Sequence, residues 1–558
     1  MRSQKPEFIL AGSSGPSGPL LERPRMPVGL KQPHDVALIK GFPAGVTCSP
    51  NAYPWILSAT ILASSMVFID GSAVNLALPV LQTELHATNV DAQWIIEAYA
   101  LFLASLMLVG GSLGDRLGRK RVFLWGVIGF AAASALCASV QTATQLIVAR
   151  AVQGMASALL TPGSLSILGA SFDERQRGKA IGTWSSFSAL TAVIGPLVGG
   201  VIVQHASWRW IFLINVPLAI GAIVATVRWV PESRDDHQVR GVDWPGALLA
   251  TLGLGAVVYA LITAGGVGWS PTITAWLLGG VILLVVFAMV EAKVPAPMMP
   301  PSLFSSRTFS VINLQTLMLY AALGGALFLL PFDLILIQHY SPTAAGAAFL
   351  PFVVLLTLLS PWAGSLCTSI GAKIPLVVGS TIAALALAGF ALPSIGGTYW
   401  TTFFAPTVVL GLGMALVVAP LTTAVMDSVD KDHFGVASGI NNAVSRTASL
   451  LAVATLSLVV AGTFNERLSQ QLASIAPSPQ IAAAVDAQRP KLAAAQAPQT
   501  ASKEVQQQID HAIAASYVSG FRLAMVLAAL LALIGAGCAA FGLPSGHRAR
   551  SYVGKVTP

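Results

Sequence analysis

The sequence contains few charged residues. Of its 558 residues only 10% are Asp, Glu, Lys or Arg, whereas 55% are hydrophobic and the mean hydropathy is +0.73. Ordinary soluble domains are about 25% charged, so this composition excludes a soluble enzyme and indicates an integral membrane protein. The formal net charge of +8 does not sit on a basic soluble domain, and we expect no nucleic-acid partner.

Several motifs that would carry chemistry are also absent. The four cysteines (48, 137, 367 and 538) are scattered and form no C-x-x-C pair, which argues against a disulfide framework or a metal site. The sequence has no H-E-x-x-H and no G-x-x-x-x-G-K-[ST], the zinc-protease and P-loop signatures. We therefore expect no metal, no cofactor and no enzymatic activity. If the protein performs work on a solute, the energy must come from an ion gradient or from the concentration gradient of the solute itself.

What the sequence does contain is a series of fourteen apolar segments, most of them near the roughly 20 residues that a membrane-spanning helix needs. The expected spans are 55–79, 92–112, 122–140, 144–170, 180–203, 209–230, 244–264, 273–291, 309–331, 344–366, 374–393, 400–426, 435–462 and 520–542. Most of the 31 Lys and Arg residues fall in alternate loops on one side. The positive-inside rule places that side, with both termini, in the cytoplasm.

Two patterns occur twice in the chain. The segment 111–120 recurs at 364–373, and the segment 171–182 recurs at 428–439. In both cases the distance along the sequence between the two copies indicates that the last six spans repeat the first six, with two helices inserted between them. Parallel repeats of this kind are typical of transporters that bind solute where two halves meet.

This repeat predicts the domain organisation. We expect a disordered cytoplasmic tail (1–53), a six-helix bundle (54–230), two inserted helices with a linker (231–308), a second six-helix bundle (309–542) that includes a periplasmic loop (463–519), and a cytoplasmic tail (543–558). Within the long loop, 502–517 has helical character because Val505, Ile509 and Ile513 recur every four residues.

The loop after the second span is short, glycine-rich and strongly basic, reading GSLGDRLGRKR over 111–121. Glycine allows a sharp turn and close approach of two helix ends. We expect the following residues to gate the cytoplasmic side: Gly111, Asp115, Arg116, Gly118, Arg119 and Lys120. The second copy has Thr368 and Ala372 in place of the acid and one of the arginines, so only the first copy is expected to gate.

Four charged residues lie inside expected spans and away from the span ends, namely Asp70, Glu97, Arg150 and Arg446. Each costs about 2.5–3.5 kcal/mol at a helix centre, so such residues are functional by default. Asp70, Glu97 and Arg150 all fall in the outer half, where they can share one cavity and couple proton movement to transport. For Asp70 a structural acid neutralised by Arg150 is the alternative. Arg446 either binds carbonyls or receives an acidic solute.

These motifs resemble those of the major facilitator superfamily, and in particular its fourteen-span drug:proton antiporters. The basic loop G-x-L-x-D-R-x-G-R-K is similar to the loop between the second and third helices of the superfamily. Asp70-x4-Asn75 and Arg150-x2-Gln153 resemble the family's first-span and fourth-span motifs, and W-R-W-I-F-x-I-N-x-P at 208–217 also fits. Ser72 stands where the family usually has Thr.

In the fifth expected span, Gly195, Pro196, Gly199 and Gly200 resemble the motif thought to distinguish exporters from importers, although Thr191 replaces an expected glycine. The resemblance implies an all-α polytopic major facilitator fold in the bacterial inner membrane, with proton-coupled export of amphipathic small molecules or drugs. Protons, membrane lipids and a periplasmic adaptor protein are the other expected partners. The residues expected to line a substrate cavity are Asn75, Trp184, Phe187, Tyr320 and Arg446.

Other functions remain open at this stage. The protein can instead export a specific metabolite, siderophore or lipid, because the sequence does not show the shape of a pocket. A non-transporting membrane sensor or scaffold is the alternative from another class, against which the internal repeat argues.

Overall fold

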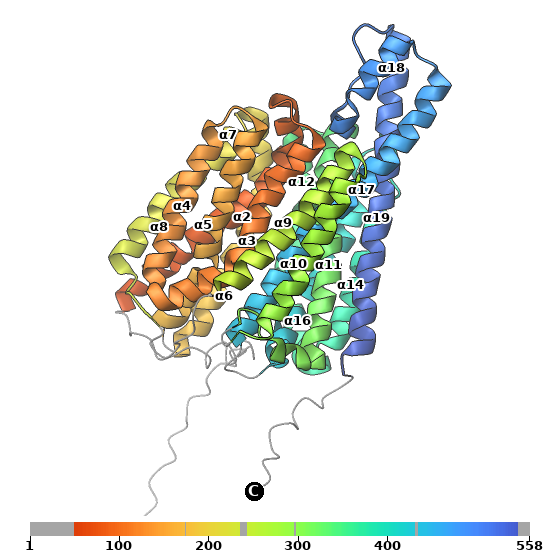
Figure 1. The fold of residues 1–558 in the computed structure, drawn as a ribbon. Helices are drawn as coiled ribbons and strands as arrows, with labels where there is room; N and C mark the ends of the chain where they lie inside the picture. The colour runs from red at the N-terminus through yellow and green to blue at the C-terminus, as the bar shows by residue number, and fades with distance from the viewer. Residues whose placement is uncertain (1–49, 173, 235–242, 295–296, 430–433, 545–558) are drawn as a thin grey trace, which may run out of the picture. The chain divides into compact units, whose positions relative to one another are not determined.

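Long helices make up the part of the chain that the computed structural model describes, which is residues 50–172, 174–234, 243–294, 297–429 and 434–544 (Figure 1). These residues all belong to one structural unit. The predicted tails, apart from 50–53 and 543–544, lie outside the described residues. The helices of the first half are α2 (Tyr53–Glu84), α3 (Asn89–Leu117), α4 (Arg119–Ser139), α5 (Ala143–Ser171), α6 (Glu174–His205), α7 (Arg209–Leu213) and α8 (Asn215–Trp229).

Two further helices, α9 (Trp244–Val267) and α10 (Pro271–Glu291), separate this half from the next. The helices of the second half are α11 (Arg307–Phe332), continued by the π-helix η3 (Asp333–Ile337), α12 (Pro342–Ala348), α13 (Leu350–Ile370), α14 (Lys373–Phe390), α16 (Phe404–Asp427), α17 (Phe434–Ile475) and α19 (Lys503–Gly542). Short elements complete the described chain: η1 (Pro50–Ala52), η2 (Pro301–Ser305), α15 (Tyr399–Thr402), α18 (Pro479–Asp486) and η5 (Arg489–Ala494).

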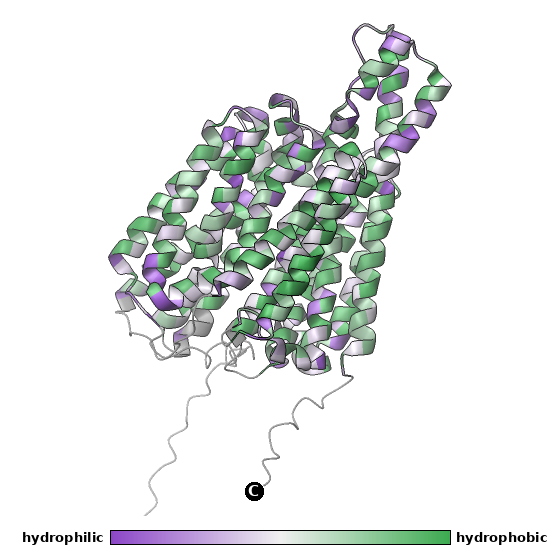
Figure 2. Ribbon diagram, in the orientation of Figure 1, coloured by the Kyte–Doolittle hydropathy of each residue, from purple (hydrophilic) through white to green (hydrophobic). Residues whose placement is uncertain are grey.

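In the part of the chain that the structure describes, thirteen of the fourteen expected spans are confirmed as long apolar helices. Thirteen helical segments among the described residues are long and apolar enough to cross a membrane. The remaining expected span, 180–203, falls in α6, a helix of 32 residues whose described apolar stretch, Ile194–His205, is shorter. Apolar residues cover most of the helix surfaces in Figure 2, as expected where lipid is the solvent.

Local sequence explains where many of these helices begin. The Thr88 hydroxyl accepts the Asp91 amide and the Asp91 carboxylate accepts the Thr88 amide, which forms a capping box at the start of α3. The serines Ser270, Ser306 and Ser341 cap α10, α11 and α12 in the simpler way, by accepting an amide three residues on. These caps satisfy backbone donors that the first turn of a helix leaves free.

The helix pairs of the first half recur in the second. In the first half α2 packs on α6 and α8, α5 packs on α3 and α4, and α4 packs on α8. At the equivalent places α11 packs on α17 and α19, α16 packs on α13 and α14, and α14 packs on α19. Contacts between the halves follow the same repeat. Helix α3 of the first half meets α17 of the second, and their counterparts α13 and α6 also meet, with α12 beside them. The packing therefore has the repeat that the sequence predicts.

The inserted helices occupy unequal positions. Helix α9 packs on α10 and also on α3 and α17, the two helices that meet across the halves. Helix α10 is mostly exposed, because only 11% of its most apolar stretch is buried inside the protein. It therefore packs mainly on α9, and its outer surface is left for lipid.

The segment 463–519, expected as a periplasmic loop, contains more helix than was predicted over 502–517. Helices α17 and α19 extend through it to 42 and 40 residues, and α18 and η5 fill much of the rest (Figure 1). The extensions form because Phe464 and Leu468 of α17 and Ile509 and Ile513 of α19 are buried at spacings of four residues. The helix predicted over 502–517 is confirmed as the start of α19.

Candidate functional site

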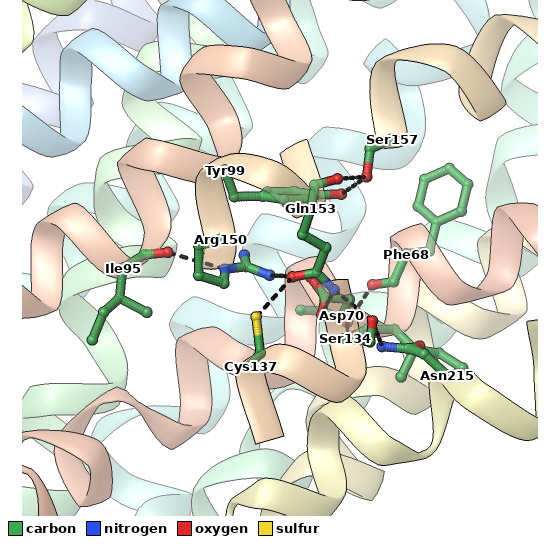
Figure 3. Close-up of polar contacts among 12 residues, drawn as sticks. Phe68, Asp70, Ile95, Tyr99, Ser134, Cys137, Arg150, Gln153, Ser157 and Asn215 are labelled. Carbon is green, nitrogen blue, oxygen red and sulfur yellow. Dashed lines mark hydrogen bonds and ion pairs between the residues drawn. The ribbon is translucent and has the colours of Figure 1, made fainter. Parts of the chain in front are cut away.

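Asp70 and Arg150 form an ion pair inside the first half. Asp70 lies in the middle of α2 and Arg150 in the first third of α5, and neither side chain is exposed to solvent. The Arg150 NH1 atom lies 2.5 Å from Asp70 Oδ2 (Figure 3). Since an isolated charge is very costly to bury, the two residues are placed so that each neutralises the other.

Gln153 completes the coordination of this carboxylate. It follows Arg150 by three residues on α5, so both side chains face the same side of the helix. Its Nε2 donates to Asp70 Oδ1 at 2.9 Å and to Ser134 Oγ of α4 at 2.9 Å, while its Oε1 accepts from Arg150 NH1 at 2.6 Å. Both oxygens of Asp70 are therefore hydrogen-bonded (Figure 3).

Helix α3 holds the other side of the Arg150 guanidinium. Arg150 Nε donates to the Ile95 carbonyl at 3.0 Å, and the guanidinium lies 4.2 Å from the centre of the Tyr99 ring. Cation–π attraction of this kind strengthens when water is excluded. The Tyr99 hydroxyl in turn accepts from Ser157 Oγ at 3.2 Å. Four helices, α2, α3, α4 and α5, thus fix one buried charge pair.

The third predicted coupling residue, Glu97, is not part of this group. Ile95 and Tyr99 face Arg150, whereas Trp94 and Leu101 of the same helix pack with residues of α9. Glu97 is three residues from Trp94 and four from Leu101, so it shares their face of α3. Its side chain is fully buried, and neither carboxylate oxygen has a hydrogen-bond partner among the described residues. The structure therefore brings Asp70 and Arg150 together and separates Glu97 from them.

The basic loop 111–121 turns at Gly118, whose φ of +110° is one that other residues rarely adopt. Asp115 pairs with Arg119 at 2.9 Å, one helical turn along. Arg116 is exposed, and Gly111 lies next to Pro162 of α5. The charges of the predicted gate are thus partly paired within the loop itself.

The same loop is bound to the segment that follows α8. Glu232 Oε1 accepts the Lys120 amide at 3.1 Å, and its other oxygen lies 3.6 Å from Arg121 Nε. The Ser233 carbonyl accepts the Arg119 amide at 3.0 Å, and Lys120 Nζ donates to the Val227 carbonyl at 2.9 Å. These contacts connect the ends of α3, α4 and α8 on one side of the helix bundle.

The glycine–proline motif of α6 forms two close helix contacts. A side chain at Gly195 would collide with Ser72 of α2, and one at Gly199 would lie 2.8 Å from Ala73 Cβ. On the other side, a Cβ at Gly200 would collide with the Pro342 carbonyl of α12. Small residues allow such close packing in membranes, and here they join α6 both to α2 and to the second half.

Comparison with known proteins agrees with this architecture. Residues 60–453 match the family model described as Major Facilitator Superfamily. The chain belongs to this superfamily. It is accordingly a multi-pass membrane transporter of small molecules rather than an enzyme.

Several relatives are similar to this superfamily member over most of their length. The tetracenomycin C resistance and export protein of Streptomyces glaucescens is 30% identical over 89% of this chain and 94% of its own. The puromycin resistance protein pur8 of Streptomyces alboniger is 33% identical over 73% and 82%. The multidrug resistance protein Stp of Mycobacterium tuberculosis is 30% identical over 76% and 79%.

Solved structures show the same fold at low identity. An inward-facing bacterial homolog of the human lysosomal transporter Spinster matches with a TM-score of 0.61 and 18% identity, covering 88% of this chain and 97% of its own. The POT family transporter PepTSo matches with a TM-score of 0.57 and 16% identity, covering 87% and 98%. At these identities the likeness concerns the major facilitator fold alone.

The residues predicted to line a substrate cavity of the transporter lie on α2, α6, α11 and α17. Among the described residues no hydrogen bond or ion pair joins any two of them. Trp184 Nε1 donates to Ser64 Oγ at 3.0 Å, and the Phe187 side chain is exposed. Asn75 Oδ1 is buried and has no hydrogen-bond partner within the described part of the chain. Arg446 and Tyr320 are half-buried and lie on the neighbouring helices α17 and α11.

Several residues at these sites were not predicted from the sequence. Ser134, Cys137 and Ser157 contact residues of the site. The sequence signal that could have identified them is that each is a small polar residue within an apolar span. Glu232 was missed because 112 positions separate it from Lys120. Asp333 is 2% exposed in η3, but the expected span ended at residue 331 and assigned it to a loop.

Proposed function

We propose that this transporter exports amphipathic small molecules, including drugs, across the bacterial inner membrane in exchange for protons. The observation that carries the proposal is the buried Asp70–Arg150 pair, in which a buried carboxylate is held, among the described residues, by one cation and one amide. Three relatives bear names of drug or antibiotic resistance. Both termini are proposed to be cytoplasmic.

Asp70 can carry the proton because its two protonation states differ in their contacts. As a carboxylate it accepts from Arg150 and Gln153. When it binds a proton it loses the ion pair, while Arg150 keeps the Ile95 carbonyl and the Tyr99 ring as partners. The cation therefore stays in place after the acid is neutralised, which allows the proton to be released again.

The helix packing supports alternating access by two bundles, 54–230 and 309–542. Each half has the same set of internal helix pairs, and the halves touch mainly through α3 with α17 and α6 with α12. In the proposed cycle Asp70 takes a proton from outside, the halves rock, and the proton leaves inside as solute binds. A proton crossing about 100 mV releases about 2.3 kcal/mol, equivalent to roughly 40-fold accumulation.

The proposal is tested in everted membrane vesicles with a pH-sensitive dye in the lumen. Puromycin, for which one relative is named, serves as the first probe. Addition of the probe should raise the pH of an acidified lumen as protons leave in exchange. Asp70→Asn should abolish this response, and the matched control Asp510→Asn, at an exposed outer position, should retain it. Proton movement that persists in Asp70→Asn vesicles would show that another group carries the proton.

Arg446 and Glu97 are proposed to have secondary roles at different places. Arg446 has no ion-pair partner among the described residues and is proposed to contact solute between α11 and α17. Glu97 is proposed as a second protonation site beside α9. The periplasmic adaptor protein stays a prediction.

A further inference from the structure

Two carboxyl groups meet at one end of the inserted helix pair. Asp243 immediately precedes α9 and Glu291 is the last residue of α10. Because α9 and α10 are antiparallel neighbours, the start of one lies beside the end of the other. The two residues are only 5% and 2% exposed. They are therefore two buried acids at the point where the chain enters and leaves the hairpin.

Each acid has one satisfied and one unsatisfied oxygen. Asp243 Oδ1 accepts the Gly246 amide at 2.9 Å, and Glu291 Oε2 accepts the Met299 amide at 2.8 Å. Asp243 Oδ2 and Glu291 Oε1 are buried without a partner among the described residues. A Cβ built at Gly246 would lie 2.5 Å from the first of these oxygens and 2.8 Å from the second.

The two unsatisfied oxygens therefore converge on one point, since both lie within 2.8 Å of the position that a Cβ at Gly246 would occupy. The glycine at 246 makes room for this approach, because any larger residue would place carbon between the two acids. Two acceptors that face each other need a donor between them.

No cation neutralises the pair in the part of the chain that the structure describes. Lys293, two residues beyond Glu291, is exposed, as are Arg234 and Arg307. Helix α3, which packs on α9, ends with Asp115 and Arg116, and the described start of α17 (434–445) has no charged residue. Among the described residues none of these groups forms an ion pair with either acid.

We propose that Asp243 and Glu291 bind one proton between them and that this proton closes the cytoplasmic end of the α9–α10 hairpin. Two carboxylates in contact cannot both remain charged without strong repulsion, and a single shared proton supplies the missing donor to both oxygens. A metal ion fits less well, because the remaining oxygens already face backbone N–H donors rather than further oxygen ligands.

The proposal gives the hairpin a response to cytoplasmic pH. Glu291 holds the Met299 amide and thereby the segment that leads through η2 into α11 of the second half. When the proton leaves, the repelling carboxylates separate and this segment is released. The connection between the inserted helices and the second half is thus firm at acidic pH and loosens as the pH rises. The inference stands independently of which solute is exported.

Hydrogen–deuterium exchange of the full-length protein in detergent tests this. The measured quantity is the exchange rate of peptides covering 292–306, corrected for the intrinsic effect of pH, between about pH 5 and about pH 9. In the native protein the corrected rate should rise by about tenfold with pH, the factor that one hydrogen bond is worth. Glu291→Gln replaces the shared proton by an amide N–H and should keep the segment protected over the whole range.

Two further variants make the outcome decisive. Asp243→Asn supplies the same amide from the other side and should also remove the pH response, which covers the case in which Glu291→Gln does not fold. Glu504→Gln, at an exposed outer position, should leave the response unchanged. A native protein without a pH response, or variants that keep it, would overturn the proposal, as would protection that depends on added Mg²⁺ or Ca²⁺.

Discussion

At the scale of single residues, the stability of the protein and its proton coupling should respond differently to changes in the Asp70–Arg150 pair. Removing one partner of a buried ion pair leaves an uncompensated charge and costs about 3–5 kcal/mol. Asp70→Asn should therefore lower the unfolding temperature markedly, because the Arg150 side chain is fully buried. The double variant Asp70→Asn with Arg150→Met should regain most of that stability, since neither charge remains, yet still fail to couple protons to export.

Thermal unfolding of the purified protein in detergent measures the first effect, and dye-loaded vesicles measure the second. The exposed control Asp510→Asn should change stability by no more than about 0.5 kcal/mol. If the single and double variants unfold at the same temperature, Asp70 does not serve to neutralise Arg150.

Glu97 gives the opposite prediction. Its oxygens have no partner among the described residues and its side chain is fully buried, so an uncharged amide of the same shape breaks no hydrogen bond or ion pair. Glu97→Gln should leave the unfolding temperature unchanged or raise it, in contrast to Asp70→Asn. A large loss of stability in the same unfolding assay would reveal a partner for Glu97 and would contradict its placement on the apolar face of α3.

At the scale of elements, the repeat supplies its own control for the loop after the second span. Gly118 has a φ of +110° and a Cβ there would lie 2.5 Å from Glu232 Oε1. Its counterpart in the second copy, Gly371, has a φ of +78° but open space around it. Gly118→Ala should cost about 1–3 kcal/mol for the backbone, plus the loss of the Glu232 contacts. Gly371→Ala should show the backbone cost alone. If both variants lower the unfolding temperature equally, the Glu232 contacts do not stabilise the loop.

Elements were predicted from sequence to the extent that local signals determine them. Apolar length located the spans, and the two repeated patterns located the halves. Contacts between distant segments were not predictable: nothing near Lys120 in the sequence identifies Glu232 as its partner, and the face on which Glu97 lies depends on how α3 packs against α9. The extension of α19 was predicted as a helix over 502–517, whereas that of α17 was not, because its buried apolar residues, such as Leu468, form no continuous apolar run.

At the scale of the whole transporter, the helical extension of the second half reaches the first half on the side that is proposed to face outward. The segment η5 contacts both α2 and α3, and Gln82 Nε2 of α2 donates to the Lys491 carbonyl at 3.3 Å. Arg489 fixes η5 to α17 by donating to the Asn465 carbonyl at 2.9 Å. If the halves rock as proposed, η5 moves with α17 and must separate from α2 each time the proposed outer side opens.

A reversible cross-link between these two places should therefore stop transport. In a chain whose four native cysteines are replaced by serine, Gln82→Cys and Lys491→Cys are joined by a short bis-methanethiosulfonate reagent, and export into vesicles is measured before and after reduction. The cross-link should abolish export and the reductant should restore it. The control pair Asn465→Cys and Arg489→Cys, both within the second half, should accept the same reagent without losing activity. Export that continues while Gln82 and Lys491 are joined would mean that the outer side opens without moving α17 away from α2, which contradicts rocking of two rigid halves.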